Sequence, residues 1–317
     1  MPSTKFGSLV PKGVYAPLIT PYNEDESLDL ETFKKHVQYV AGAGIGCVAL
    51  GSMGEAVQLT HSERTQVVRA AREALDSDPK LARVPLVVGT GASSTRETIE
   101  LTKEAAAEGA DFAMVIAPGY FAGALSKQAL KGFFVDVAEA SPIPIILYNY
   151  PGASAGIDMD SDLIANIAAA SKNIVGIKLT CGSVGKLTRL TTLGEDFAVL
   201  GGFVDFLGPS LFSNAAGGIT GTANIAPKTC LKLYESTVSA LSGSASFQDA
   251  ASLQSIVSRA DWVLQKVGIS GTKYALQQLR GYGGAPRRPL LPFDSADGKG
   301  DKLLEELREI LEVERGL

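Results

Sequence analysis

The sequence is poor in the residues that build metal sites, disulfide frameworks and histidine-dependent catalysis. Its 317 residues include two histidines, His36 and His61, and three cysteines, Cys47, Cys181 and Cys230. The cysteines are far apart and form no Cys-x-x-Cys pair, which argues against a disulfide framework and favours a reducing compartment. The two histidines do not stand four residues apart and are too few for a typical zinc site, so we predict no metal.

An excess of positive charge and a long apolar run are also missing. Lys and Arg number 29 against 34 Asp and Glu, a formal net charge of −5, so no basic surface for nucleic acid is expected. No run reaches the roughly 18 apolar residues that a membrane span needs. The first thirty residues hold no arginine and several acids, unlike a secretory or transit peptide. We therefore predict a cytoplasmic protein without nucleic-acid or membrane partners.

Eight short apolar runs, rich in Val and Ile, alternate with segments of helical periodicity. They cover residues 14–20, 46–52, 85–91, 112–118, 143–148, 174–180, 197–201 and 218–223. Continuous apolar runs are typical of strands buried on both faces, as in a parallel sheet. Eight strand–helix units in roughly 240 residues predict an α/β fold of the (β/α)8 type, a TIM barrel. The alternative is an open doubly wound sheet, but no Gly-rich phosphate turn follows the first run.

The strand pattern ends after about residue 237. Apolar residues then recur at helical spacing, first from Leu253 to Val267 and again from Leu303 to Leu311. We predict a barrel over residues 1–240, which carries the active site, and a C-terminal helical region over residues 241–317.

Several polar residues are expected to have structural roles. Asp29, Thr60 and Ser126 stand where helices should begin, and Thr60 has capping-box spacing to a glutamate three residues later. We expect both histidines at surface or cap positions. We expect Arg287 and Arg288 to be solvated charges or interface contacts.

Lys178 lies inside an otherwise apolar predicted strand, residues 174–180. Because side chains alternate across a strand, Val175, Ile177 and Leu179 should pack on helices. Ile174 and Lys178 should then point into the barrel. A lysine desolvated there has a lowered pKa and becomes a nucleophile for carbonyl groups, able to form a Schiff base. The alternative is a lysine at the strand end whose ammonium reaches solvent, and the residues alone leave both open.

Two neighbouring features bear on that choice. Tyr148 ends the preceding predicted strand at the same depth as Lys178, so contact between them is plausible, and a phenol beside an amine can move protons. Ser52 lies in the segment Gly-Ser-Met-Gly-Glu, residues 51–55, after the second strand. Its glycines would let backbone N–H groups converge on a carboxylate. The alternatives are that Tyr148 is a simple wall residue of the barrel and that residues 51–55 form an ordinary turn.

Together these segments resemble the dihydrodipicolinate synthase / N-acetylneuraminate lyase family of class I pyruvate-dependent aldolases. The resemblance rests on Gly-Ser-Met-Gly-Glu at 51–55, Leu-Tyr-Asn-Tyr-Pro at 147–151 and Gly-Ile-Lys at 176–178, and it runs from about residue 12 to 292. The segment 281–290 is most similar to the 4-hydroxy-2-oxoglutarate aldolase or 2-keto-3-deoxy sugar acid aldolase branch. The family implies a barrel with a C-terminal helical region, assembled as a homotetramer or homodimer.

The resemblance implies roles for individual residues. Lys178 matches the Schiff-base lysine, Tyr148 the proton-shuttling tyrosine and Ser52 a hydroxyl of the proton relay. The backbone of Ser52 and Met53 matches the pyruvate carboxylate site. Tyr120 matches a tyrosine that in synthase members reaches the neighbouring subunit's site. Two further binding residues are expected, the pocket-wall residue Ile219 by resemblance and Thr180 as a hydrogen-bond donor to substrate. No cofactor is implied beyond the lysine Schiff base.

Departures from the family pattern narrow the reaction. Synthases carry an arginine just after the strand-five proline, but Gly152 and Ala153 follow Pro151 here. Without that carboxylate clamp, aspartate semialdehyde is disfavoured as a partner. We therefore expect cleavage of a 4-hydroxy-2-oxo acid, either 4-hydroxy-2-oxoglutarate or a 2-keto-3-deoxy sugar acid, to pyruvate and an aldehyde. One alternative is the synthase condensation. The other is a non-catalytic barrel that binds a 2-oxo acid, because Met53 stands where the family usually has Thr or Asn and Leu179 where an acid is common.

Overall fold

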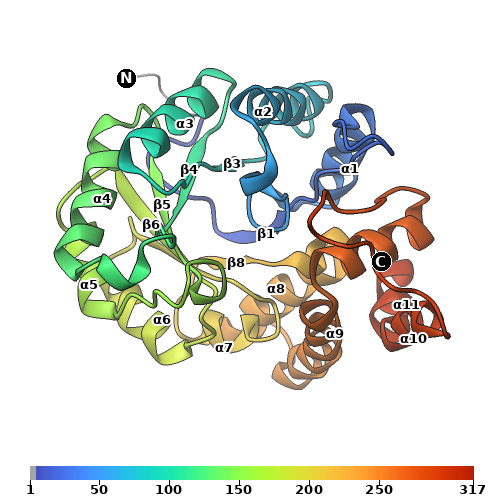
Figure 1. The fold of residues 1–317 in the computed structure, drawn as a ribbon. Helices are drawn as coiled ribbons and strands as arrows, with labels where there is room; N and C mark the ends of the chain where they lie inside the picture. Colours follow the sequence, from blue (N-terminus) through green and yellow to red (C-terminus); the bar gives the residue numbers. More distant parts are fainter. Residues whose placement is uncertain (1–4) are drawn as a thin grey trace.

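The computed structural model describes residues 5–317, and its centre is a closed barrel of eight parallel strands in chain order (Figure 1). This confirms the predicted TIM barrel. Each strand is short and buried. The strands are β1 Gly13–Pro17, β2 Gly46–Ala49, β3 Leu86–Gly89, β4 Phe112–Ile116, β5 Ile145–Asn149, β6 Ile174–Leu179, β7 Ala198–Gly201 and β8 Gly217–Ile219. Most observed strands end earlier than the predicted ones. Because β2 ends at Ala49, Ser52 lies in a loop three residues beyond it rather than on the strand.

Helices surround the barrel and begin at the predicted caps. The side chains of Asp29, Thr60 and Ser126 each accept a hydrogen bond from the third residue beyond, and Thr60 with Glu63 forms a complete capping box. The barrel helices are α1 Leu30–Gly42, α2 His61–Asp76, α3 Thr95–Ala107, α4 Lys127–Ala140, α5 Ser161–Ala168, α6 Val184–Leu190, α7 Leu207–Phe212 and α8 Pro227–Leu241.

The predicted alternation of side chains is wrong at the start of β6. Register pairs Ile145 with Ile174 but Ile146 with Gly176, so β6 has one extra residue at this point. This bulge turns Val175 into the barrel interior, where it belongs to the same apolar cluster as Tyr148, while Ile174 packs outward. Alternation resumes beyond the bulge, and Lys178 points inward as predicted.

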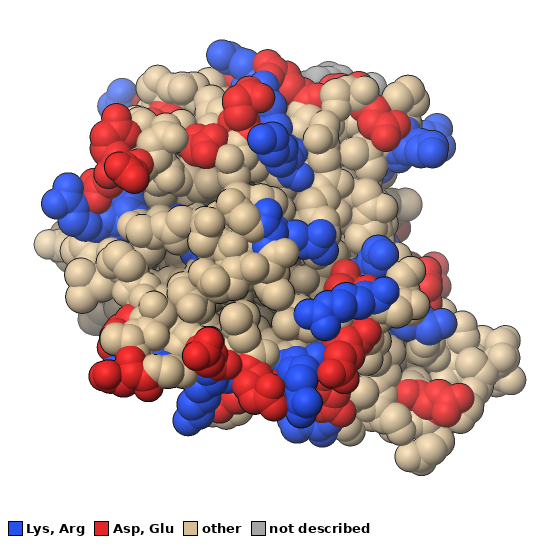
Figure 2. Space-filling model, turned by 90° about the vertical axis from the view of Figure 1, so that its right-hand side faces the viewer, with Lys and Arg blue, Asp and Glu red and all other residues tan. Residues whose placement is uncertain are grey.

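The C-terminal region is helical, as predicted, and comprises α9 Phe247–Arg280, α10 Lys299–Glu306 and α11 Arg308–Gly316. The long helix α9 is interrupted at Gly268, whose φ of 60° and ψ of −150° are not helical. The proposed boundary at residue 240 falls within the last turn of α8. Figure 2 views the molecule from the side on which α9, α10 and α11 lie in Figure 1, and there basic and acidic side chains are interspersed. Among the described residues, no helix is long and apolar enough to cross a membrane.

Candidate active site

The centre of the candidate site is a contact between two neighbouring strands. Tyr148 on β5 and Lys178 on β6 are register partners. Lys178 Nζ donates a hydrogen bond of 3.3 Å to the Tyr148 hydroxyl and lies 4.4 Å from the centroid of the phenol ring. Each residue is only 4% exposed. The lysine therefore does not reach solvent, and of the two possibilities that the sequence left open the structure has the buried one.

Burial changes the acid–base chemistry of both groups. It lowers the pKa of Lys178 to about 7, because the charged ammonium loses its hydration without gaining an acidic partner. Burial raises the pKa of Tyr148 to about 12, although the Ser52 and Thr180 hydroxyls partly offset that rise. At neutral pH the site thus holds an amine with a substantial neutral fraction beside a protonated phenol.

Five of the seven predicted site residues line one cavity of about 260 Å³ at the carboxyl ends of the strands. They are Ser52, Met53, Tyr148, Lys178 and Thr180. The carboxyl end of the strands is where TIM-barrel enzymes build their active sites. The cavity therefore brings together the amine of Lys178, the phenol of Tyr148 and several hydroxyl groups.

Thr180 contributes a buried hydroxyl that forms no well-aligned hydrogen bond with any described residue. It follows β6 and faces the backbone of Gly202, where a Cβ would lie only 2.1 Å from Thr180 Oγ1. Glycine at position 202 thus makes room for the threonine in the cavity wall. A buried hydroxyl without a well-aligned partner is costly unless something pairs with it, so Thr180 is available to a ligand.

The loop that carries Ser52 and Met53 is held by contacts to the segment after β1 and to the C-terminal region. The Thr20 hydroxyl donates to the Gly54 carbonyl at 2.7 Å, and Glu55 has a left-handed backbone conformation with a φ of 56°. The carboxylate of Glu55 accepts hydrogen bonds from Lys273 Nζ at 2.6 Å and from the Arg287 backbone N–H at 2.8 Å. The side chains of the Glu55–Lys273 pair are fully buried, so α9 and residue 287 both hold this loop in place.

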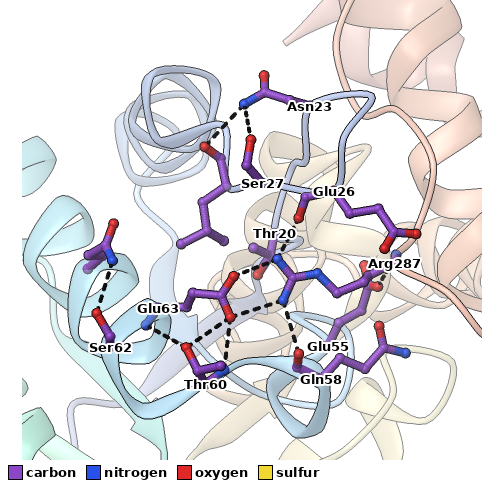
Figure 3. A network of polar contacts seen from close by, with 12 residues as sticks. Thr20, Asn23, Glu26, Ser27, Glu55, Gln58, Thr60, Ser62, Glu63 and Arg287 are labelled. Atoms are coloured by element: carbon purple, nitrogen blue, oxygen red, sulfur yellow. Dashed lines mark hydrogen bonds and ion pairs between the residues drawn. The ribbon is translucent and has the colours of Figure 1, made fainter.

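Arg287 is not the solvated charge that the sequence suggested. Its guanidinium donates to Glu63 Oε1 at 2.7 Å, to the Gln58 carbonyl at 3.0 Å and to the Glu26 carbonyl at 2.5 Å (Figure 3). It also lies 4.6 Å from the ring centroid of Tyr22. Arg287 thus ties the turn after α9 to two loops of the barrel mouth, whereas Arg288 is exposed and pairs with Glu26.

His36 is likewise buried rather than at the surface. It is 0% exposed, and its ring nitrogens lie 2.9 Å from Asn224 Oδ1 and 3.1 Å from the Tyr282 hydroxyl. Burial lowers the pKa of His36 to about 4, so the ring is neutral near pH 7. His61, which starts α2 and pairs with Glu104, is at the surface as expected.

Two predicted site residues do not line the cavity. Tyr120, after β4, is 81% exposed, and its ring makes an edge contact with Phe121. Ile219 on β8 is fully buried in the apolar cluster inside the barrel. Two roles stay predictions: that of Tyr120 in a neighbouring subunit's site and that of Ile219 in substrate binding.

Sequence reasoning missed the part of the cavity wall that comes from α9. Asp261 and Gln265 line the cavity together with Thr222, which follows β8. Asp261 stands among apolar residues at helical spacing, and that pattern indicated only a core-facing helix. Its position over the barrel mouth depends on how α9 returns across the strand ends.

Comparison with known proteins finds relatives that cover nearly the whole chain. The sequence model of the dihydrodipicolinate synthetase family matches residues 10–307. A protein of Emericella nidulans named probable 4-hydroxy-2-oxoglutarate aldolase, mitochondrial, is 45% identical over 98% of this chain and 97% of its own. An L-threo-3-deoxy-hexylosonate aldolase of Hypocrea jecorina is 44% identical over 97% of this chain and 98% of its own.

A solved structure has the same fold over its full length. It is a dihydrodipicolinate synthase family protein from Coccidioides immitis, 34% identical, with a TM-score of 0.85 over 98% of this chain and 99% of that one. The barrel and the C-terminal helices are therefore shared as one arrangement.

Proposed function

The chain belongs to the dihydrodipicolinate synthetase family, and within it we propose a Schiff-base lyase that cleaves a 4-hydroxy-2-oxo acid to pyruvate and an aldehyde. The observation that carries this proposal is the buried Lys178, whose Nζ lies 3.3 Å from the Tyr148 hydroxyl and whose pKa burial lowers to about 7. A neutral amine at this position attacks a carbonyl carbon, and the phenol exchanges protons with the groups around it.

The proposed reaction starts at C2 of the substrate. The neutral Lys178 amine adds to the C2 carbonyl, and loss of water gives an iminium. The Tyr148 phenol gives its own proton to the departing water, and the phenolate that remains, working with Ser52, takes the proton of the C4 hydroxyl. The electrons of the C3–C4 bond move into the iminium, the aldehyde leaves, and an enamine remains on the lysine. Protonation at C3 and hydrolysis of the imine release pyruvate and restore the amine, so no cofactor is needed.

The relatives support both candidate substrate classes. One is named for 4-hydroxy-2-oxoglutarate and the other for a 3-deoxy-hexylosonate. The synthase reaction has less support, because Pro151 is followed by Gly152 and Ala153. No arginine is among the described residues that line the cavity, so a bidentate clamp for a second carboxylate is missing there.

Substitution of Lys178 by Ala tests the lyase directly. The variant should lose turnover of every 4-hydroxy-2-oxo acid while keeping its circular dichroism spectrum and sedimentation coefficient. Lys127→Ala, in an exposed ion pair with Asp160 on the barrel's outer helices, is the matched control and should retain activity. Turnover retained by the Lys178 variant would contradict the proposal. Binding of pyruvate by the wild type without any turnover would favour a non-catalytic barrel.

Two further properties stay predictions. We propose a homotetramer or homodimer, and a monomer in sedimentation velocity at micromolar concentration would contradict this. Cytoplasmic localisation also stays a prediction. The name of the Emericella nidulans relative includes the word mitochondrial, which is a different compartment. Fractionation of the source cells would settle the compartment.

A further inference from the structure

The side of the cavity built by α9 has a polar wall that the proposed bond cleavage does not use. Asp261, which is 2% exposed, accepts hydrogen bonds through Oδ1 from the hydroxyls of Thr222 and, at 3.2 Å, Thr220. Its other oxygen, Oδ2, accepts one of 2.9 Å from Gln265 Nε2. These bonds hold the carboxylate in one orientation in the wall of the cavity that contains Lys178.

The charges in this cavity are asymmetric. Among the described residues that line it, Lys178 is the one cation and Asp261 the one anion. The proposed reaction uses the lysine at C2, so no cation is left for a second carboxylate on the far end of the substrate. Burial raises the pKa of Asp261 to about 6, but the three hydrogen bonds that its carboxylate accepts oppose that rise and favour the anion. A buried anion repels another anion brought into the same low-dielectric space.

The same wall is rich in hydrogen-bond acceptors. Asp261 Oδ1 already accepts two hydrogen bonds, but Oδ2 accepts only one and keeps a free lone pair. The Thr222 hydroxyl, which donates to Asp261, can accept from a ligand. Gln265, which also lines the cavity, donates through its amide nitrogen to Asp261 and to Asp205, so its side-chain carbonyl oxygen can still accept a hydrogen bond. Acceptors in this number suit a ligand that offers several O–H donors, as a hydroxylated carbon chain does.

We propose that Asp261, Thr222 and Gln265 form the subsite for the aldehyde half of the substrate and select a neutral hydroxylated chain over one that ends in a carboxylate. This inference rests on the proposed function and makes it more specific. Of the two candidate classes, it assigns the 2-keto-3-deoxy sugar acids, which release a hydroxyaldehyde, in preference to 4-hydroxy-2-oxoglutarate, which releases glyoxylate.

The test compares two aldehydes in the condensation direction, with pyruvate held constant. Purified full-length protein should show a kcat/KM for glyceraldehyde at least about tenfold above that for glyoxylate at pH 7.5. Asp261→Asn should reduce this preference at least about fivefold, mainly because kcat/KM for glyoxylate rises. Asp205→Asn is the matched control, because Asp205 also accepts a hydrogen bond from Gln265 but does not line the cavity. This variant should keep the ratio of the two kcat/KM values within about twofold of the wild-type ratio.

A second variant covers the case in which Asp261→Asn fails to fold. Thr222→Val keeps the carboxylate but removes one acceptor, so KM for glyceraldehyde should rise about three- to tenfold without any improvement with glyoxylate. A wild-type preference for glyoxylate, or a ratio unchanged in both variants, would overturn the subsite.

Pyruvate trapping on the wild type and on each variant distinguishes a failure of the subsite from a failure of the proposed lyase. If borohydride reduces a pyruvate imine on Lys178 but glyoxylate is the better partner, the subsite is wrong and the lyase stands. If no imine forms on the folded wild type, the proposed function and the subsite both fail.

Discussion

Lys178 Nζ and the Tyr148 hydroxyl lie 3.3 Å apart because the two residues are direct register partners on β6 and β5. Parallel strands of a closed barrel tilt together, so side chains at equal register reach the same depth. The contact is thus a product of strand pairing, and neither residue depends on a mobile loop for its position. Desolvation of the amine follows from the same placement, and with it the ability to act as a nucleophile near neutral pH.

The first prediction concerns the pH dependence of imine formation. Burial lowers the pKa of Lys178 to about 7, and only the neutral amine attacks a carbonyl. The initial rate of borohydride-trapped pyruvate adduct should therefore rise with pH through a midpoint near 7 and level off above about 8. Rates measured from pH 5.5 to 10 by intact mass spectrometry check this. A rate that keeps rising to pH 10 would show an ordinary exposed lysine.

The second prediction separates proton transfer from imine formation. Tyr148→Phe keeps the ring that fills the cavity wall but removes the hydroxyl that takes the C4 proton. Cleavage should slow by roughly 10²–10⁴-fold, while the pyruvate adduct on Lys178 still forms. Steady-state kinetics with trapping on the same sample measures both effects. Cleavage within tenfold of the wild type would exclude Tyr148 as the proton carrier.

The third prediction is that the buried lysine lowers the stability of the fold. Because the folded-state pKa of Lys178 is depressed below the usual 10.5, the folded state binds fewer protons than the unfolded state between about pH 7 and 10.5. Lys178→Met should raise the free energy of unfolding by on the order of a few kcal/mol. The gain should be fully present at and below pH 7 and should shrink as pH rises toward 10.5.

Urea unfolding of both proteins at pH 7 and pH 10 measures that gain. A Met variant that is less stable than the wild type at pH 7 would mean that the lysine contributes favourable contacts in the fold. A gain that does not change between the two pH values would assign it to packing rather than to desolvation of the amine.

The fourth prediction concerns the buried ion pair behind the Ser52 loop. Glu55→Gln leaves the Lys273 ammonium without its charged partner, although both side chains are 0% exposed in the native pair. The variant should lose about 3–5 kcal/mol of stability. It should also raise KM for pyruvate, because the backbone of Ser52 and Met53 is less well fixed.

Two variants control that experiment. Glu100→Gln breaks an exposed pair with Arg96 and should change stability very little. The double variant Glu55→Gln with Lys273→Met removes both charges and should recover much of the lost stability. If the single Glu55 variant were as stable as the wild type, the pair would not hold the loop.

The sequence predicted those parts of the molecule that depend on local pattern. Eight apolar runs were enough for the barrel, and they placed Tyr148 and Lys178 near the carboxyl ends of two neighbouring strands. Caps at Asp29, Thr60 and Ser126 were readable because their bonds join residues three apart. These features require no knowledge of distant contacts.

Features decided by distant contacts were missed or misread. The bulge that turns Val175 inward is a property of the pairing of β5 with β6. Arg287 is more than 200 positions from its partner Glu63, and Asp261 reaches the cavity only because α9 returns over the strand ends. His36 contacts Asn224 and Tyr282, which are 188 and 246 positions away in the sequence.

Reductive trapping tests the central claim most directly. The protein is incubated with pyruvate and borohydride, and intact and peptide mass spectrometry locates the adduct. We predict one pyruvate-derived modification per chain, on Lys178, which borohydride without pyruvate does not produce and which Lys178→Ala abolishes. A folded protein that gains no adduct, or gains it on another lysine, would contradict the assignment of Lys178 as the Schiff-base residue.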